Sequence, residues 1–143
     1  MSNHYHLLLK TPNSDIDKFM YWFNKTFSEL LKEKTGRINR MFGSNYKWSL
    51  IKDQSYLKNV VSYIYQNPVR AKIVQNPEDY RFSTLFFIKH HLELGFTFTK
   101  EIDFQDELFF FNNSFKETEL KQIKIGLTKS VFKIPGKRSK LRS

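Results

Sequence analysis

The sequence predicts an α/β (α+β) domain, and three segments carry this prediction. Residues 4–10 place His4 and His6 in alternation with apolar side chains, a pattern typical of a strand buried on one face. Residues 46–51 are aromatic and alternating, so they predict a second strand. Between them, apolar residues recur at helical intervals from Ile16 to Leu31. We therefore expect helices packed on a sheet.

The first predicted helix has recognisable start and stop signals. Ser14 is a suitable N-cap, and Asp17 follows it at the spacing of a capping box. Gly36 follows the last apolar position and is suited to the left-handed conformation that ends helices. The apolar stripe of this helix is explained fully by packing against a core, so we assign it no chemistry.

A second helix is predicted after Asp53, which can cap it. Its apolar stripe consists of Leu57, Val60, Val61 and Ile64. On the neighbouring face, Asn67 lies one turn beyond Tyr63. The Asn67–Pro68 pair predicts the end of this helix, because the residue before a proline disfavours helical geometry. The same pair also predicts the start of a short helix, because proline suits the first helical position, and residues 76–79 repeat this asparagine–proline start signal.

Composition limits the classes of binding partner and of chemical site that the chain can have. The 143 residues carry a formal charge of +10, which favours a polyanion: nucleic acid first, and an anionic membrane surface second. The absence of cysteine excludes disulfides and thiolate metal sites. No apolar run is long enough to span a bilayer, and the N-terminus lacks a signal-peptide layout. We therefore expect a cytoplasmic protein.

The histidine pair and one tyrosine are the candidate chemical groups. On a strand, His4 and His6 would share a face, and two neighbouring imidazoles are a natural start for a divalent-metal site. Tyr63, on a helix, could act as a covalent nucleophile. Each piece alone has a structural reading, because a His-x-His pattern arises by chance and helical tyrosines usually pack. Their joint arrangement is more specific.

Four motifs in order resemble the single-tyrosine HUH transposases, in particular the REP-associated tyrosine transposase branch. Residues 3–9 (NHYHLLL) are similar to the family's histidine–hydrophobic–histidine strand. Residues 42–47 (FGSNYK) resemble its Phe-x-x-Arg-Tyr-Lys segment, with Asn45 in place of the arginine. Residues 63–71 (YIYQNPVRA) resemble its signature helix, and residues 77–83 (PEDYRFS) resemble the segment that follows.

The resemblance implies a fold and a division of the chain. The fold is a ferredoxin-like antiparallel sheet with helices on one face. Met1 aligns with a methionine that is internal in the family, so the sheet is expected to be incomplete at the N-terminus. Residues 1–85 would form a partial catalytic-type domain and residues 86–133 an extension of uncertain fold. Residues 134–143 would form a basic disordered tail.

The resemblance also implies a mechanism. Tyr63 would attack a DNA phosphodiester and form a 5′-phosphotyrosine link, leaving a free 3′-hydroxyl. His4, His6 and Asn67 would hold a magnesium or manganese ion. The expected partner is single-stranded or hairpin DNA, with a second copy of the chain as a candidate partner and no membrane. The residues expected to contact nucleic acid are Arg40, Tyr46, Lys47, Arg70 and Lys72.

Two alternatives stay open from the sequence. The chain could be a non-catalytic nucleic-acid-binding remnant of such a transposase, which the missing N-terminal elements favour. It could also be a basic protein with an unrelated hydrolytic metal site at His4 and His6. The first alternative predicts DNA binding without cleavage, and the second predicts metal-dependent turnover without a covalent DNA adduct.

Overall fold

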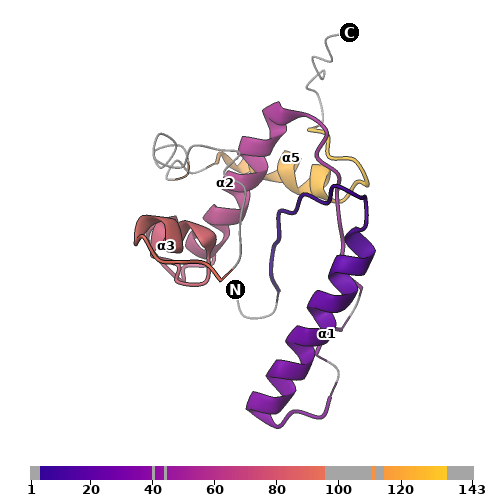
Figure 1. Ribbon diagram of the computed structural model, residues 1–143. Helices are drawn as coiled ribbons and strands as arrows, with labels where there is room; N and C mark the ends of the chain where they lie inside the picture. The colour runs from indigo at the N-terminus through magenta and orange to yellow at the C-terminus, as the bar shows by residue number, and fades with distance from the viewer. Residues whose placement is uncertain (1–3, 40, 44, 96–110, 112–114, 135–143) are drawn as a thin grey trace. The chain divides into compact units, whose positions relative to one another are not determined.

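The computed structural model describes residues 4–39, 41–43, 45–95, 111 and 115–134 (Figure 1). The chain divides into two compact units: Leu7–Lys47, called here the α1 unit, and Met1–His6 with Trp48–Ser143, called the α2 unit. Of the described residues, 52% are helical and 2% are in β pairing. The regular structure of the described residues is therefore almost entirely helical.

The α1 unit contains one long helix, α1 (Ile16–Thr35). It begins one residue later than predicted, with Asp15 at the N-cap, because Ser14 adopts a positive φ of 54°. It ends as predicted at Gly36, whose φ of 65° lies in the left-handed region. The Gly36 N–H donates to the Lys32 carbonyl at 2.8 Å. These local signals were sufficient to place the helix.

Aromatic rings line one face of α1. Phe23 lies between Phe19 and Phe27, with centroid distances of 5.9 and 6.2 Å. Phe42, on the segment after the helix, contacts the last of these rings at 6.0 Å. On the same segment, the Tyr46 hydroxyl donates a hydrogen bond to the Asp17 carboxylate. These two contacts tie the returning chain to α1 within its own unit.

The α2 unit is organised around α2 (Gln54–Arg70). Asp53 caps it as predicted, because its carboxylate accepts the Ser55 N–H at 2.8 Å. The predicted end at Asn67–Pro68 is wrong, since the helix continues through Pro68 to Arg70. A proline in the last turn removes only one intrahelical hydrogen bond, and burial of this segment offsets that loss.

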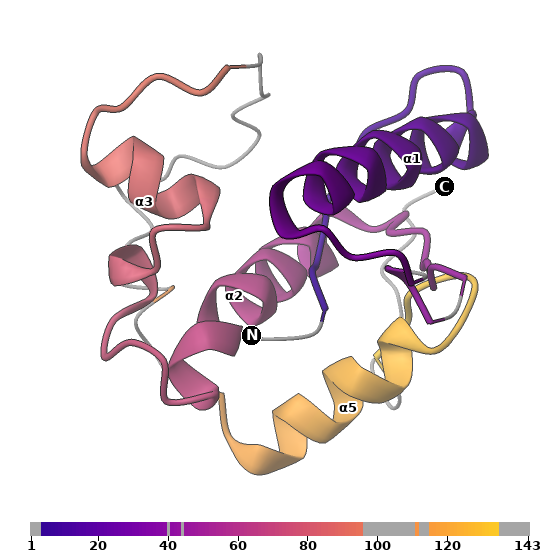
Figure 2. The ribbon, with the colours of Figure 1, turned by 90° about the horizontal axis from the view of Figure 1, so that it is seen from below.

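Helix α2 is buried on two faces, which explains why so few of its side chains reach solvent. One face packs against α5 (Glu117–Leu127) and the residues just after it. The other packs against α3 (Thr84–Lys89), which follows the short 3-10 helix η1 (Pro77–Asp79). Figure 2 shows α3 and α5 on different sides of α2. The start signal at residues 76–79 is confirmed by η1.

The segment after α5 closes the first of these two clusters. Phe132 is 1% exposed and its ring meets that of Tyr56 edge to face at 5.5 Å. A Cβ on Gly126 of α5 would lie 2.8 Å from the Phe132 ring, so glycine permits this close approach. Ile134, which the sequence assigned to a disordered tail, is also buried here. The rest of that predicted tail, residues 135–143, lies outside the described residues.

The predicted ferredoxin-like sheet is wrong for the part of the chain that the structure describes. Residues 4–10 are irregular, and the only β pairing within the described ranges is one isolated parallel bridge between Leu50 and Val131. A strand needs a neighbour to pair its backbone groups, and an alternating pattern does not supply one. Leu7 and Leu9, expected on the buried face of the strand, are 42% and 36% exposed.

Candidate active site

His4, His6 and Tyr63 lie together in the α2 unit. The two imidazole rings meet edge to face, with centroids 5.2 Å apart. The His6 ring then meets the Tyr63 ring edge to face at 5.9 Å. The irregular segment at residues 4–6, and not a strand, therefore brings the two histidines to α2. His6 and Tyr63, which are 57 positions apart in the sequence, thus become neighbours, and Tyr63 lies in the third turn of α2.

Arg70 lies over the same tyrosine from within α2. Its Cζ atom is 4.5 Å from the centroid of the Tyr63 ring, a cation–π contact. One guanidinium nitrogen, Nη2, donates to the Asn67 Oδ1 atom. Tyr63, Asn67 and Arg70 follow each other at helical offsets of four and then three, which places them on one face. The sequence predicts that Asn67 lies one turn beyond Tyr63, and the structure adds Arg70 to the same face.

The surroundings of His6 favour its neutral form. Burial lowers the pKa of His6 below its ordinary value, and the nearby charges of His4 and Arg70 lower it further. A neutral imidazole is the form that donates a lone pair to a metal ion. Burial likewise lowers the pKa of Arg70, an effect that its interaction with Tyr63 opposes.

The fit of a divalent metal differs among the three predicted ligands. His4 and His6 fit, because two adjacent imidazoles supply two nitrogen donors. Asn67 fits less well in the observed arrangement, because its oxygen accepts from Arg70, whose positive charge opposes a cation at the same atom. Among the described residues, no group of three or more His, Cys, Asp or Glu side chains is placed to hold a metal. Magnesium and manganese commonly keep several water ligands, so two protein ligands are compatible with either ion.

Tyr63 is itself a core residue. It is 7% exposed and belongs to the cluster that includes Val60, Ile123 and Phe132. Tyr65 is equally buried but faces the opposite cluster, where its hydroxyl is 2.8 Å from that of Thr84. Tyr63 and Tyr65 therefore have separate surroundings, and it is the ring of Tyr63 that contacts His6 and Arg70.

The other predicted DNA contacts are distributed over both units. Arg70 is the last residue of α2, and Lys72 follows just after the helix, where it adopts a positive φ of 56° and is exposed. Tyr46 and Lys47 belong to the α1 unit. The hydrogen bond from the Tyr46 hydroxyl to Asp17 raises the pKa of that hydroxyl. Arg40 lies outside the described residues.

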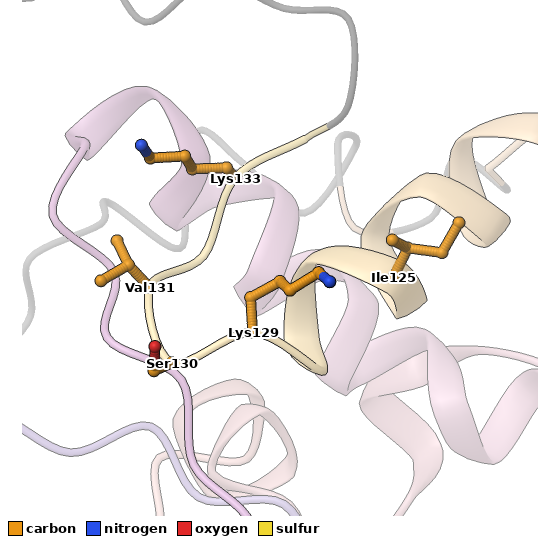
Figure 3. Close-up of a pocket in the computed structure, with 5 residues that line it drawn as sticks. All are labelled: Ile125, Lys129, Ser130, Val131 and Lys133. Atoms are coloured by element: carbon orange, nitrogen blue, oxygen red, sulfur yellow. The ribbon is translucent and has the colours of Figure 1, made fainter.

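A separate cavity of about 400 Å³ lies at the end of α5 and is lined by Ile125, Lys129, Ser130, Val131 and Lys133. It contains none of the candidate catalytic residues. Figure 3 shows that the side chains of Lys129 and Lys133 point in opposite directions. They do not converge on a common point, so we assign no anion site to this cavity.

Comparison with protein-family models, with curated protein sequences and with solved structures finds no match to the chain. In the described residues, no helix has both the length and the apolar character needed to cross a bilayer. The functional argument therefore depends on the site itself.

Proposed function

We propose that the chain is a DNA transposase that cleaves and rejoins single-stranded or hairpin DNA through Tyr63. The observation that carries this proposal is the contact of the Tyr63 ring with both His6 and Arg70. A tyrosine that merely fills a core needs neither a neutral imidazole nor a guanidinium beside it. A nucleophile acting on a phosphodiester is helped by a positively charged donor where negative charge develops.

The reaction exchanges one phosphoester bond for another. The Tyr63 oxygen forms a bond to phosphorus while the bond from phosphorus to the 3′ oxygen breaks. The phenol loses its proton and the leaving 3′ oxygen gains one, so a 5′-phosphotyrosine and a free 3′-hydroxyl result. Because the bond energy is kept in the covalent link, the reverse step can rejoin DNA without a nucleotide cofactor.

His4 and His6 are the residues that would hold a magnesium or manganese ion. Such an ion would polarise the scissile phosphate and neutralise part of its charge. The role of His6 in this proposal is to supply a neutral nitrogen next to Tyr63, and the role of Arg70 is to contact both the tyrosine and the DNA backbone. Their contacts with the Tyr63 ring support both roles.

Covalent adduct formation is the direct test. Incubated with Mn²⁺ or Mg²⁺ and a hairpin-bearing DNA strand, the protein is expected to form an adduct that survives denaturing electrophoresis. EDTA in place of the metal should prevent it, and so should His6→Ala. A protein that binds the strand but gives no adduct with either metal would contradict the cleavage proposal.

The burial of Tyr63 favours the second candidate, a non-catalytic DNA-binding protein. A hydroxyl attached to a core ring must become accessible before it can attack a phosphate. This candidate keeps the basic surface and needs no chemistry from the histidine pair. It predicts salt-sensitive DNA binding in the absence of adduct.

Both candidates require binding that falls steeply with salt. Each phosphate neutralised on single-stranded DNA contributes a slope of about −0.7 to the dependence of log affinity on log salt concentration. Removal of residues 135–143, which include Lys137, Arg138, Lys140 and Arg142, is expected to weaken binding and flatten this slope. Fluorescence anisotropy with a labelled oligonucleotide at several salt concentrations measures both. The truncation stops after the buried Ile134, so the core cluster stays intact.

Binding that does not respond to salt would contradict a phosphate-based contact. An unchanged slope after truncation would place the DNA contacts elsewhere on the chain.

A further inference from the structure

Two hydrogen-bond donors at the end of α2 have no partner. They are the Asn67 Nδ2 atom and the Arg70 Nη1 atom, and both are buried. A buried donor without a partner costs about 1–3 kcal/mol, and more when the group is charged. The two side chains are also hydrogen-bonded to each other, so their two unpartnered donors form one cluster and call for a shared explanation.

The orientation of the Asn67 amide is fixed by Arg70. A guanidinium has five N–H donors and no acceptor, so the amide atom that it contacts must be the oxygen. The amide nitrogen is therefore the atom left without a partner. Reversing the amide would place two donors against each other and leave the oxygen unpaired, so this orientation follows from chemistry.

The cluster offers donors to an anion and opposes a cation. The Asn67 oxygen accepts from Arg70, and the amide atom that is left without a partner is a nitrogen donor, which cannot ligate a metal. The Arg70 charge also repels any cation near Asn67. An oxygen anion, in contrast, can accept from Nδ2 and Nη1 at once, and arginine is well matched to phosphate oxygens. Both residues are partly exposed although the two donor atoms are buried, so binding an anion requires the two side chains to move outward.

We propose that Asn67 and Arg70 form a phosphate-binding pair beside Tyr63, in which Asn67 is a hydrogen-bond donor to the DNA backbone and not a metal ligand. This inference rests on the proposed function, since it names which groups hold the phosphodiester next to the nucleophile. Arg70 contacts the Tyr63 ring and Asn67 at the same time, so a phosphate bound by the pair lies next to the tyrosine.

Binding of DNA without metal separates a phosphate contact from a metal ligand. The probe is a short fluorescent single-stranded oligonucleotide in EDTA, so neither cleavage nor metal coordination contributes. Asn67→Asp replaces the donor nitrogen by an acceptor and pairs its charge with Arg70, and it is expected to weaken binding about tenfold or more. Asn59→Asp is the matched control, because it adds the same charge to the same helix away from Arg70. It should change the affinity less than about threefold.

Titration with Mn²⁺ alone tests the other half of the proposal. Asn67→Ala deletes the amide, and it should leave the Mn²⁺ affinity of the DNA-free protein within about threefold of the parent value. A loss of tenfold or more would identify Asn67 as a ligand and overturn the assignment. Unchanged oligonucleotide affinity of Asn67→Asp in EDTA would overturn it as well.

Arg70→Lys provides an independent variant in case the Asn67 variants fold poorly. It keeps the charge but loses the forked donors, so it is expected to weaken metal-free binding, whereas equal affinity would contradict the pair. Circular dichroism at 222 nm establishes that each variant keeps its helices. Adduct formation by the parent protein is a separate result. If no adduct forms but the variants lose metal-free DNA affinity, the cleavage proposal is wrong and the phosphate-binding pair is supported. If the adduct forms but the variants keep their metal-free affinity, cleavage is supported and the phosphate-binding pair is wrong.

Discussion

Replacing Tyr63 by phenylalanine is expected to abolish the covalent protein–DNA adduct while leaving DNA binding within about threefold of the parent protein. The substitution deletes only the attacking oxygen. The ring stays in place, so its contacts with His6 and Arg70 and its packing in the core cluster are kept. Denaturing electrophoresis with a labelled DNA strand detects the covalent adduct, and fluorescence anisotropy measures the DNA affinity.

Tyr65→Phe is the control for this experiment because the second tyrosine is equally buried on the same helix. It faces the cluster with Leu85 and Phe111 and does not belong to the cluster of Tyr63. Losing its hydrogen bond to Thr84 should cost about 1 kcal/mol of stability and leave the adduct intact. An adduct that persists in Tyr63→Phe but disappears in Tyr65→Phe would identify the second tyrosine as the nucleophile.

The helices were predictable because their signals are local. Gly36 ends α1 and Asp53 caps α2, and each acts through atoms within one turn of the helix end. Such signals need no knowledge of the rest of the chain. The small errors, at Ser14 and at Pro68, occur where the backbone conformation or tertiary burial overrides a local preference.

The sheet was mispredicted because strand formation is not local. Alternation in residues 4–10 shows which side chains can be buried together, but a strand also requires a partner for its backbone groups. In the described residues, residues 4–10 remain irregular and expose their leucines. The histidine pair nevertheless reaches Tyr63, because the contact requires only the chain at residues 4–6 to pass α2.

The residues of the site could be predicted from the sequence, but the hydrogen bonds between them could not. The sequence named Tyr63, Asn67 and Arg70, and helical spacing is enough to put them on one face. It could not show that Arg70 takes the Asn67 oxygen, since an asparagine can present either amide atom. That contact decides whether Asn67 serves a cation or an anion, and it depends on the side-chain conformation in which Arg70 lies over the Tyr63 ring of the same helix.

Phe132→Ala is expected to destabilise the protein by about 3–5 kcal/mol, a large part of the stability of a small domain. The side chain is fully buried between α2 and α5, against the Tyr56 ring and below Gly126, so its removal leaves a cavity that the neighbouring helices cannot readily fill. Urea unfolding followed by circular dichroism measures the change in free energy. The sequence did not single out this residue, since nothing local to residues 131–134 marks them as core.

Phe82→Ala is the matched control, because the same atoms are removed from a side chain that is 72% exposed. It should change the free energy of unfolding by no more than about 0.5 kcal/mol. Tyr63 shares its core cluster with Phe132, so the Phe132 variant should also weaken the packing that positions the tyrosine beside His6. Adduct formation should then fall at urea concentrations where the parent protein is still active. A cost below about 1 kcal/mol for Phe132→Ala would mean that the segment after α5 does not support α2, and that the buried position of Tyr63 has another cause.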